Sequence, residues 1–253
     1  MELLIEKLPY ILGAGVLLGL LIVWELKFPE VEIENNVKKR SYLTNTLILL
    51  TNNAVFFAFS VTTIYTVAYS YRLHDWWEYL PMLGQVVGGV IVLDFVVWLW
   101  HWLSHNNNLL WRFHQAHHSE IYLNATSAIR FHVGELFLSL LFKAGFLMLL
   151  GIPFWVFLLN EILITVFAAF HHSNMQLSPR VQSVLEKIII TPDLHRVHHS
   201  TERFQHDTNY GVIFSWWDRL LKTRLVAPIR VYGLKGIGEK NFIQFLVFPF
   251  LKK

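Results

Sequence analysis

Histidine is the residue type in this sequence whose spacing points most directly to chemistry. The chain holds 13 histidines and no cysteine in 253 residues. Two motifs, HQAHHS at 114–119 and HRVHHS at 195–200, each place histidines at the first, fourth and fifth positions, and a third, HWLSH at 101–105, places two histidines four residues apart. Histidine is the commonest metal ligand in proteins. The three motifs therefore predict a metal site.

The spacing within the motifs indicates how many ions they hold. Residues four apart on a helix lie on one face with Cβ atoms about 5–6 Å apart, so His101 and His105 are placed to share one ion. The spacing of three between His114 and His117 predicts the same sharing, while the adjacent His118 is rotated by about 100° and suits a second ion. The eight imidazoles of the motifs are also twice what a closed tetrahedral zinc site needs. We therefore expect a two-metal site.

Other uses of histidine fit this pattern less well. A single pair at helical spacing often arises as interface polarity, but three motifs, two with identical spacing, do not. Haem takes one axial histidine from each of two facing helices, and a metal-storage tract is low in complexity. Imidazole accepts zinc, iron, copper and nickel alike, so the ligand type leaves the metal open.

Long apolar segments must position these motifs. Hydrophobic residues make up 54% of the chain and charged residues 15%, against about 25% charged in an ordinary soluble domain. We expect spanning helices at 8–24, 43–69 and 83–100. Two shorter apolar stretches, 136–150 and 154–170, flank a Gly-Ile-Pro turn and predict a helical hairpin. Whether the hairpin fully crosses the bilayer stays open.

The distribution of basic residues predicts on which side of the membrane the histidines lie. With these spans, residues 27–42, residues 101–133 and the chain after 171 share one side, which carries 18 of the 21 lysines and arginines. The positive-inside rule places that side in the cytoplasm. Twelve of the 13 histidines lie there, and only His74 does not. The net charge of +3 requires no nucleic-acid partner, because anionic lipid head groups favour basic residues on this face.

The motifs and their flanking residues resemble the fatty acid hydroxylase and sterol desaturase superfamily of integral membrane diiron oxygenases. The resemblance runs from Asp94 to Thr223, about half of the chain, and keeps the order of the family's motifs. LDFVVWLWHWLSH resembles the first histidine box, LLWRFHQAHHS the second, and TPDLHRVHHS with its trailing NYG and WD the third. LNATSAIRFHVGE and FHHSN match the elements between the boxes.

The resemblance implies nine iron ligands. Eight are the box histidines and the ninth is His172, with His171 as the alternative because the alignment slips easily within a histidine pair. The implied ligands are His101, His105, His114, His117, His118, His172, His195, His198 and His199.

Five further residues are expected to support these ligands. Asp94 lies two helical turns before the first box and is placed to orient an imidazole through its free N–H, as carboxylates beside metal-bound histidines do. The resemblance implies similar supporting roles for His132, Glu135, Asp207 and Asn209.

The resemblance also completes the predicted organisation. We expect an all-α, multi-pass membrane helical bundle of three spans plus a short helical hairpin, with a cytosolic histidine-rich helical metal site. Its regions are an N-terminal transmembrane region at 1–93, a fatty acid hydroxylase-like catalytic domain at 94–224 with its membrane hairpin at 134–172, and a C-terminal tail at 225–253. The apolar end of the tail suits an interfacial helix, and a core-packing helix fits equally. A cell inner membrane and an endoplasmic reticulum membrane both agree with this topology.

The implied activity is oxidation of a lipid by dioxygen. Two iron ions are the expected cofactor, with zinc as a substitute in purified or crystallised protein. The enzyme would hydroxylate or desaturate an unactivated C–H bond; ether cleavage also stays open, as do fatty acyl, sterol, carotenoid and alkyl glycerol substrates. An external electron donor, a ferredoxin or a cytochrome with its reductase, is expected because no dinucleotide-binding glycine motif, flavin fold or cytochrome domain is visible.

A membrane zinc protein is the rival interpretation. A zinc hydrolase needs a carboxylate or an equivalent base beside the metal-bound water, and no His-Glu-x-x-His motif is present. A transporter needs polar groups near the midplane of several spans, whereas these histidines gather at one face. A metal sensor could keep every ligand, but the RFHVGE and NYG elements favour the enzyme.

Overall fold

The structure, a computed structural model, describes residues 2–59, 61–229 and 231–251, and gives only the backbone for residues 2–12, 14, 61 and 62. Every regular element in this part is a helix, and extended segments pair only in isolated bridges, which confirms the predicted all-α class. The α-helices are α1 Glu2–Lys27, α2 Asn35–Ala58, α3 Val61–Ser70, α4 Met82–Asn106, α5 Asn108–His114, α6 Val133–Leu150, α7 Phe154–His172, α8 Pro179–Leu185, α9 Pro192–His198, α10 Arg203–His206, α11 Trp216–Leu220 and α12 Phe242–Val247. The 3₁₀ helices are η1 Trp76–Tyr79, η2 His117–Ser119, η3 Ala125–Ile129 and η4 Phe248–Phe250.

Three helices of the described chain are long and apolar enough to cross a membrane: α4, α6 and α7. They contain 25, 18 and 19 residues. At 1.5 Å per residue these lengths correspond to about 27–38 Å, against a hydrocarbon core of about 30 Å. α4 contains the third predicted span, and α6 and α7 form the predicted hairpin, each long enough to span.

Of the other two predicted spans, the second differs from expectation and the first stays a prediction. The second, 43–69, is divided between α2 and α3, which pass the same test only as a pair bent by 53°. The first, 8–24, lies within the 26-residue helix α1, but part of it falls on residues whose side chains lie outside the described ones. The described chain therefore has three candidate spanning helices, or four if the bent pair forms one span.

The turn between α6 and α7 is fixed by Gly151 and by the segment before α4. Gly151 ends α6 in the left-handed conformation with φ 62°, and a Cβ there would lie 1.9 Å from the carbonyl oxygen of His74. Trp77 donates its indole N–H to the carbonyl of Leu150 over 2.9 Å, and it packs in a buried cluster with Leu93. Any side chain at 151 would therefore push the turn off this support.

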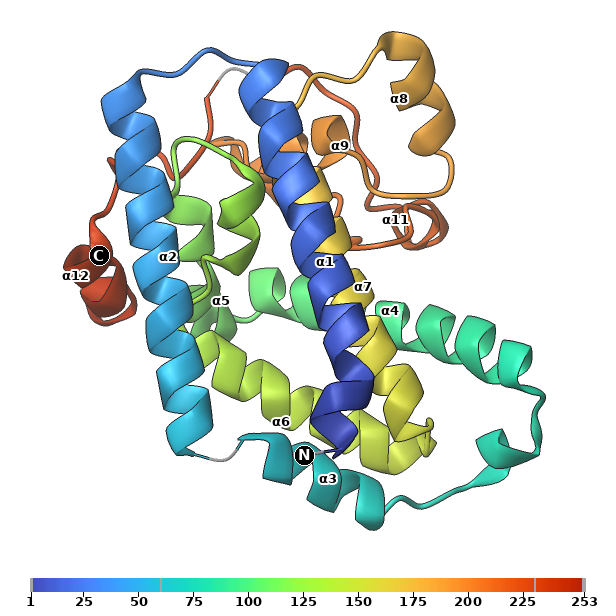
Figure 1. The fold of residues 1–253 in the computed structure, drawn as a ribbon. Coiled ribbons are helices and arrows are strands. Elements are labelled where there is room, and N and C mark those ends of the chain that lie inside the picture. The colour runs from blue at the N-terminus through green and yellow to red at the C-terminus, as the bar shows by residue number, and fades with distance from the viewer. Residues whose placement is uncertain (1, 60, 230, 252–253) are drawn as a thin grey trace.

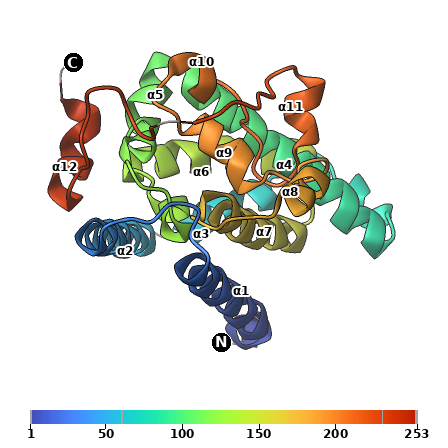
Figure 2. The same ribbon diagram turned by 90° about the horizontal axis from the view of Figure 1, so that it is seen from above.

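The helix ends that carry histidines meet around α9. Viewed from above, α9 is surrounded by α4, α5, α6 and α7, whereas α1, α2 and α12 lie at the edge (Figure 2). α7 packs against α1, α4, α9 and η3. The short helices α8, α9 and α11 lie at the end of the molecule opposite α3 (Figure 1). Because α4, α5 and α7 carry histidines in their last turns, the fold brings separate segments together at one place.

The C-terminal tail packs against the rest of the chain through one side. Phe245 and Phe248 are buried in a cluster with Ile48 of α2 and with Ala116, which lies inside the second histidine motif. Ile243 is exposed. α12 therefore contributes to the core and also presents an apolar side outward.

Candidate metal centre

Nine buried histidines form two groups in the described part of the chain. Within each group, one ring nitrogen of every histidine lies within 4.8 Å of those of the others. The five-histidine group is His101, His105, His114, His118 and His198, and the four-histidine group is His117, His172, His195 and His199. These are the nine predicted ligands, and His171, the alternative to His172, belongs to neither group.

The second histidine motif contributes to both groups. His114 and His118 lie together in the five-histidine group, with their Nε2 atoms 3.2 Å apart, while His117 lies in the other group. The predicted sharing between His114 and His117 is therefore wrong. α5 ends at His114 and the chain continues through a turn into the 3₁₀ helix η2, and the pair that shares a group is the one four residues apart.

The third motif has the same arrangement with the two groups exchanged. His195 and His199 lie in the four-histidine group, with their Nε2 atoms 3.1 Å apart, and His198 lies in the five-histidine group. In both motifs the first and fifth positions share a group and the fourth position crosses to the other. The crossing interlocks the two motifs and explains why the chain repeats the pattern.

Hydrogen bonds at Nδ1 direct the opposite nitrogen of most five-histidine group members inward. An Nδ1–H that donates to oxygen fixes the tautomer and leaves the Nε2 lone pair free for a metal. The Nε2 atoms of His101, His105 and His198 are buried and have no hydrogen-bond partner in the described chain. The Nδ1 acceptors are the Tyr210 carbonyl for His101 at 2.8 Å, Asp207 for His105 at 3.2 Å, Glu135 for His114 at 2.6 Å and the Thr208 carbonyl for His198 at 2.7 Å.

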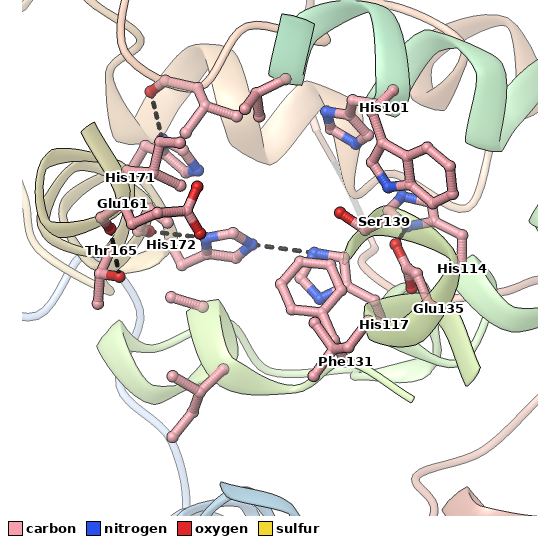
Figure 3. Close-up of a pocket in the computed structure, with 18 of the residues that line it drawn as sticks. His101, His114, His117, Phe131, Glu135, Ser139, Glu161, Thr165, His171 and His172 are labelled. Atoms are coloured by element: carbon pink, nitrogen blue, oxygen red, sulfur yellow. Dashed lines mark hydrogen bonds and ion pairs between the residues drawn. The ribbon is translucent and has the colours of Figure 1, made fainter. Parts of the chain in front are cut away.

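The four-histidine group brings its Nε2 atoms still closer together. The Nε2 of His172 lies 3.1 Å from that of His117 and 2.9 Å from that of His195, and the first contact is drawn in Figure 3. The Nδ1–H of His172 donates to the Ala168 carbonyl over 2.7 Å, so its Nε2 carries a lone pair. Ligands on a metal with bonds of about 2.1 Å lie about 3.0 Å apart in octahedral and about 3.4 Å apart in tetrahedral geometry. The nitrogens therefore fit around a cation.

Burial keeps five histidines of the second and third motifs neutral. It lowers the pKa of His117, His118, His195, His198 and His199 well below the ordinary value, and neighbouring histidines lower it further, because a second positive charge nearby is unfavourable. The neutral imidazole is the form that binds metal. The buried imidazoles are therefore in the protonation state that can bind a metal ion.

Two of the five predicted supporting residues contact histidines of the five-histidine group. Glu135, in the first turn of α6, accepts the 2.6 Å bond from His114, and Asp207 accepts the 3.2 Å bond from His105. Asp207 also lies 3.5 Å from the Nε2 of His206. Both carboxylates sit where they can increase the basicity of a bound imidazole.

Contrary to expectation, Asp94 does not contact a histidine but binds the chain after Tyr210. Its carboxylate accepts the backbone N–H groups of Ile213 and Phe214, each over 3.1 Å, and the indole N–H of Trp217 over 3.0 Å. It therefore orients no imidazole directly. Asp94 instead fixes the chain that follows Tyr210, whose carbonyl holds His101.

Asp218 performs the matching task and was missed by the sequence reasoning. It accepts the backbone N–H groups of Tyr210 and Gly211 over 2.9 and 2.8 Å and the indole N–H of Trp98 over 2.9 Å. The Trp-Asp element after the third motif was its only signal. Burial raises the pKa of Asp218, which these three donors counteract.

His132, Asn209 and His171 lie beside the centre without joining it. His132 caps α6 by accepting the Gly134 N–H over 3.0 Å. Asn209, at φ 54°, donates its amide to the Leu194 carbonyl over 2.9 Å and thereby holds α9. His171 hydrogen-bonds the Val212 carbonyl over 3.2 Å.

Replacement of Glu135 tests the support of the five-histidine group. Glu135→Leu removes the acceptor that orients His114, and we expect metal affinity to fall by about 10–100-fold. Glu135→Gln keeps an acceptor oxygen and should retain most of the affinity. Competition with a chelator, followed by elemental analysis, measures both. Equal affinities for the leucine variant and the unaltered protein would contradict the assignment.

A cavity of about 240 Å³ opens beside both groups. It reaches His101 and His114 from one group and His117, His172 and His195 from the other. Figure 3 shows α7 residues along one side and residues of α6 and the second motif along the other. Most of its remaining lining is apolar, from α4, α6, α7 and η3. An apolar cavity that ends on a metal centre suits an aliphatic substrate.

A buried polar network holds the outer helices to this centre, and sequence reasoning missed it. Glu25 of α1 accepts the backbone N–H groups of Ala125 and Asn174, both over 2.9 Å. Arg130 is fully buried and donates to Asn45 of α2 over 3.0 Å. These bonds join α1 and α2 to the segment between the second motif and α6.

Comparison with known proteins identifies relatives of the chain. The family model described as Fatty acid hydroxylase matches residues 86–223. Ornithine lipid hydroxylase OlsE of Rhizobium tropici is 35% identical over 204 residues, covering 78% of this chain and 60% of that protein. Alkylglycerol monooxygenases of Danio rerio and Homo sapiens are 33% and 30% identical over 70% and 65% of this chain, but over only 37% and 36% of their own length. No solved structure matches the chain.

Proposed function

The chain belongs to the fatty acid hydroxylase family, and from that membership we propose that it is a membrane-bound diiron oxygenase. It uses dioxygen to hydroxylate or desaturate an unactivated C–H bond of a lipid. The observation that carries the proposal is the pairing of two histidine groups with an apolar cavity that touches both. The relatives named for ornithine lipid and alkylglycerol favour a polar-headed lipid as the substrate class.

Each group would hold one iron ion through its Nε2 atoms. When bound, the two irons supply the reductive activation of dioxygen and the oxidising power that breaks a C–H bond. The protein's residues hold the ligands in place: Glu135, Asp207 and backbone carbonyls fix the imidazole tautomers. Phe131 stacks on His117 with ring centroids 4.4 Å apart and shields the four-histidine group from water.

Electrons would come from a separate donor protein on the cytoplasmic side. A second, more polar cavity of about 730 Å³ reaches His105 and Trp111 and is lined by Arg203 and Lys235. The Trp111 ring lies 4.9 Å from that of His105. The two cavities share no lining residue, so reductant and lipid need not compete for space.

A zinc hydrolase that used the same histidines would place different demands on the nearby carboxylates. A zinc hydrolase would need a base at an open metal position, yet Glu135 and Asp207 are both engaged at the Nδ1 side of histidines. The carboxylates nearest to the centre therefore support ligands, which favours the oxygenase.

Isotope incorporation tests the proposed activity. Membranes that contain the iron-loaded protein are supplied with a reductase, its redox protein, lipid extract and ¹⁸O₂, and the lipids are analysed by mass spectrometry. A lipid that gains one ¹⁸O atom, or loses two hydrogens while dioxygen is consumed, is the expected product. The His117→Ala variant should form none. Equal product in both preparations would contradict the proposal.

A further inference from the structure

The apolar cavity extends away from the histidines along the membrane hairpin. Its lining runs on α6 from Glu135 to Lys143 and on α7 from Glu161 to His172, with positions that recur every three or four residues and so lie on one face of each helix. At 1.5 Å per residue these stretches are about 12 and 17 Å long. The cavity is therefore elongated along the helices and suits an extended chain.

An ion pair lies at the far end of this cavity. The Nζ of Lys143 lies 2.6 Å from a carboxylate oxygen of Glu161, and the two side chains are 17% and 32% exposed. Tyr65 of α3 lies beside Lys143 and Glu161. Charged groups inside spanning helices are costly and usually serve a function. This pair lies mid-helix in α6 and α7, both of which are strongly apolar.

The ion pair leaves hydrogen-bonding capacity unused. The Oε1 atom of Glu161 is buried and has no hydrogen-bond partner among the described residues. Lys143 carries three N–H donors, and Glu161 accepts one of them. A ligand group that donates a hydrogen bond would satisfy the free carboxylate oxygen. One that also accepts, such as a hydroxyl, would engage a remaining ammonium proton.

We propose that Glu161 and Lys143 bind a hydrogen-bond-donating polar group of the lipid substrate, a hydroxyl, amine or amide, at the opposite end of the cavity from the histidines. The carbon to be oxidised then lies about 12–17 Å from that group, a separation set by the helical rise along α6 and α7. The position of the oxidised carbon rests on the proposed function, whereas recognition of the polar group does not. Glu161 and Lys143 thus select the substrate and determine which carbon meets the metal centre.

A purely structural ion pair would tie α3, α6 and α7 together without selecting ligands. Replacing a buried ion pair by apolar residues of similar volume often leaves stability unchanged, so Lys143→Met with Glu161→Met should fold. The double variant removes both the charges and the free carboxylate oxygen. Ligand preference, rather than stability, therefore separates the two roles.

Competition between two lipids of matched length provides the test. Protein purified with its metal is kept free of dioxygen and reductant and equilibrated with equal amounts of dodecan-1-ol and methyl dodecyl ether, which lacks the donor, and native mass spectrometry counts each bound ligand. We expect the unaltered protein to prefer the alcohol by about tenfold, because the ether leaves the buried carboxylate oxygen unpaired. The double variant should bind both equally, and Arg72→Met with Glu78→Met, which removes an ion pair outside the cavity, should keep the preference.

Two results would contradict the binding role of Glu161 and Lys143. Equal binding of both ligands to the unaltered protein, or a preference that persists in the double variant, would overturn the proposal. If the double variant is not recovered as folded protein, Glu161→Gln serves instead: its amide can donate to the ether oxygen, so the preference should narrow. Because the binding test runs without dioxygen and reductant and so needs no turnover, absence of lipid oxidation would defeat the proposed function and leave this result standing.

Discussion

Replacing His117 and His199 together with alanine is expected to lower the metal content from two ions per chain to one. Both residues belong to the four-histidine group, so the double variant leaves that group with two ligands and the five-histidine group intact. Turnover should fall at least about a hundredfold, since even loss of a residue that supports a ligand costs 10–100-fold. Elemental analysis of purified protein measures the first effect, and dioxygen consumption with lipid measures the second.

The control for this prediction is His171→Ala. His171 lies between the same segments and its ring centroid is 4.0 Å from that of His195, yet it belongs to neither group. Two ions should remain bound in this variant. If the His117/His199 double variant instead lost both ions in equal measure, the crossed arrangement of the two motifs would be refuted.

Replacing Arg130 with methionine is expected to destabilise the protein by about 3–5 kcal/mol, the cost of removing one partner from a buried charge pair. Arg130 is fully buried and lies 3.2 Å from Glu239 and 4.0 Å from Glu120. Its loss leaves these carboxylates without their cation and detaches Asn45 of α2. Unfolding in detergent, followed by tryptophan fluorescence, measures the change.

Arg203→Met is the matched control. Arg203 forms an ion pair with Asp207 at 3.1 Å, but its side chain is 83% exposed, so the change should stay within about 0.5 kcal/mol. Similar losses of stability in the two variants would show that Arg130 does not hold α2 and the C-terminal tail to the segment between the second motif and α6.

The spanning helices were predictable because a membrane helix must be written as a continuous apolar run. Asp94 did not obscure α4, and Gly151 with Pro153 marked the hairpin turn. The division of the second span into α2 and α3 was not predictable, because the apolar run continues through both helices without a proline or a charge. The helix α5 was equally hidden: it is short, and its position depends on packing against α4 and α6.

Residue type and motif order pointed to the nine histidines that the fold gathers, but not to their division into two groups. Which histidine of each motif joins the other group depends on how the two motifs face each other in the fold, and neither HQAHHS nor HRVHHS carries a marker of that arrangement. Asp94 and its partner Phe214 are 120 residues apart in the chain, as are Asp218 and Trp98, and Arg130 and Asn45 are 85 residues apart. Spacing rules act within one element and cannot find such contacts.

The central claim, a histidine-ligated pair of iron ions, is tested most directly by elemental analysis and Mössbauer spectroscopy of protein purified from cells grown on iron-57. We expect two irons per chain that are antiferromagnetically coupled after oxidation. Both the iron content and the Mössbauer spectrum should change when His117 is replaced by alanine. Two zinc ions that iron cannot displace, together with no dioxygen consumption under reductant, would contradict it.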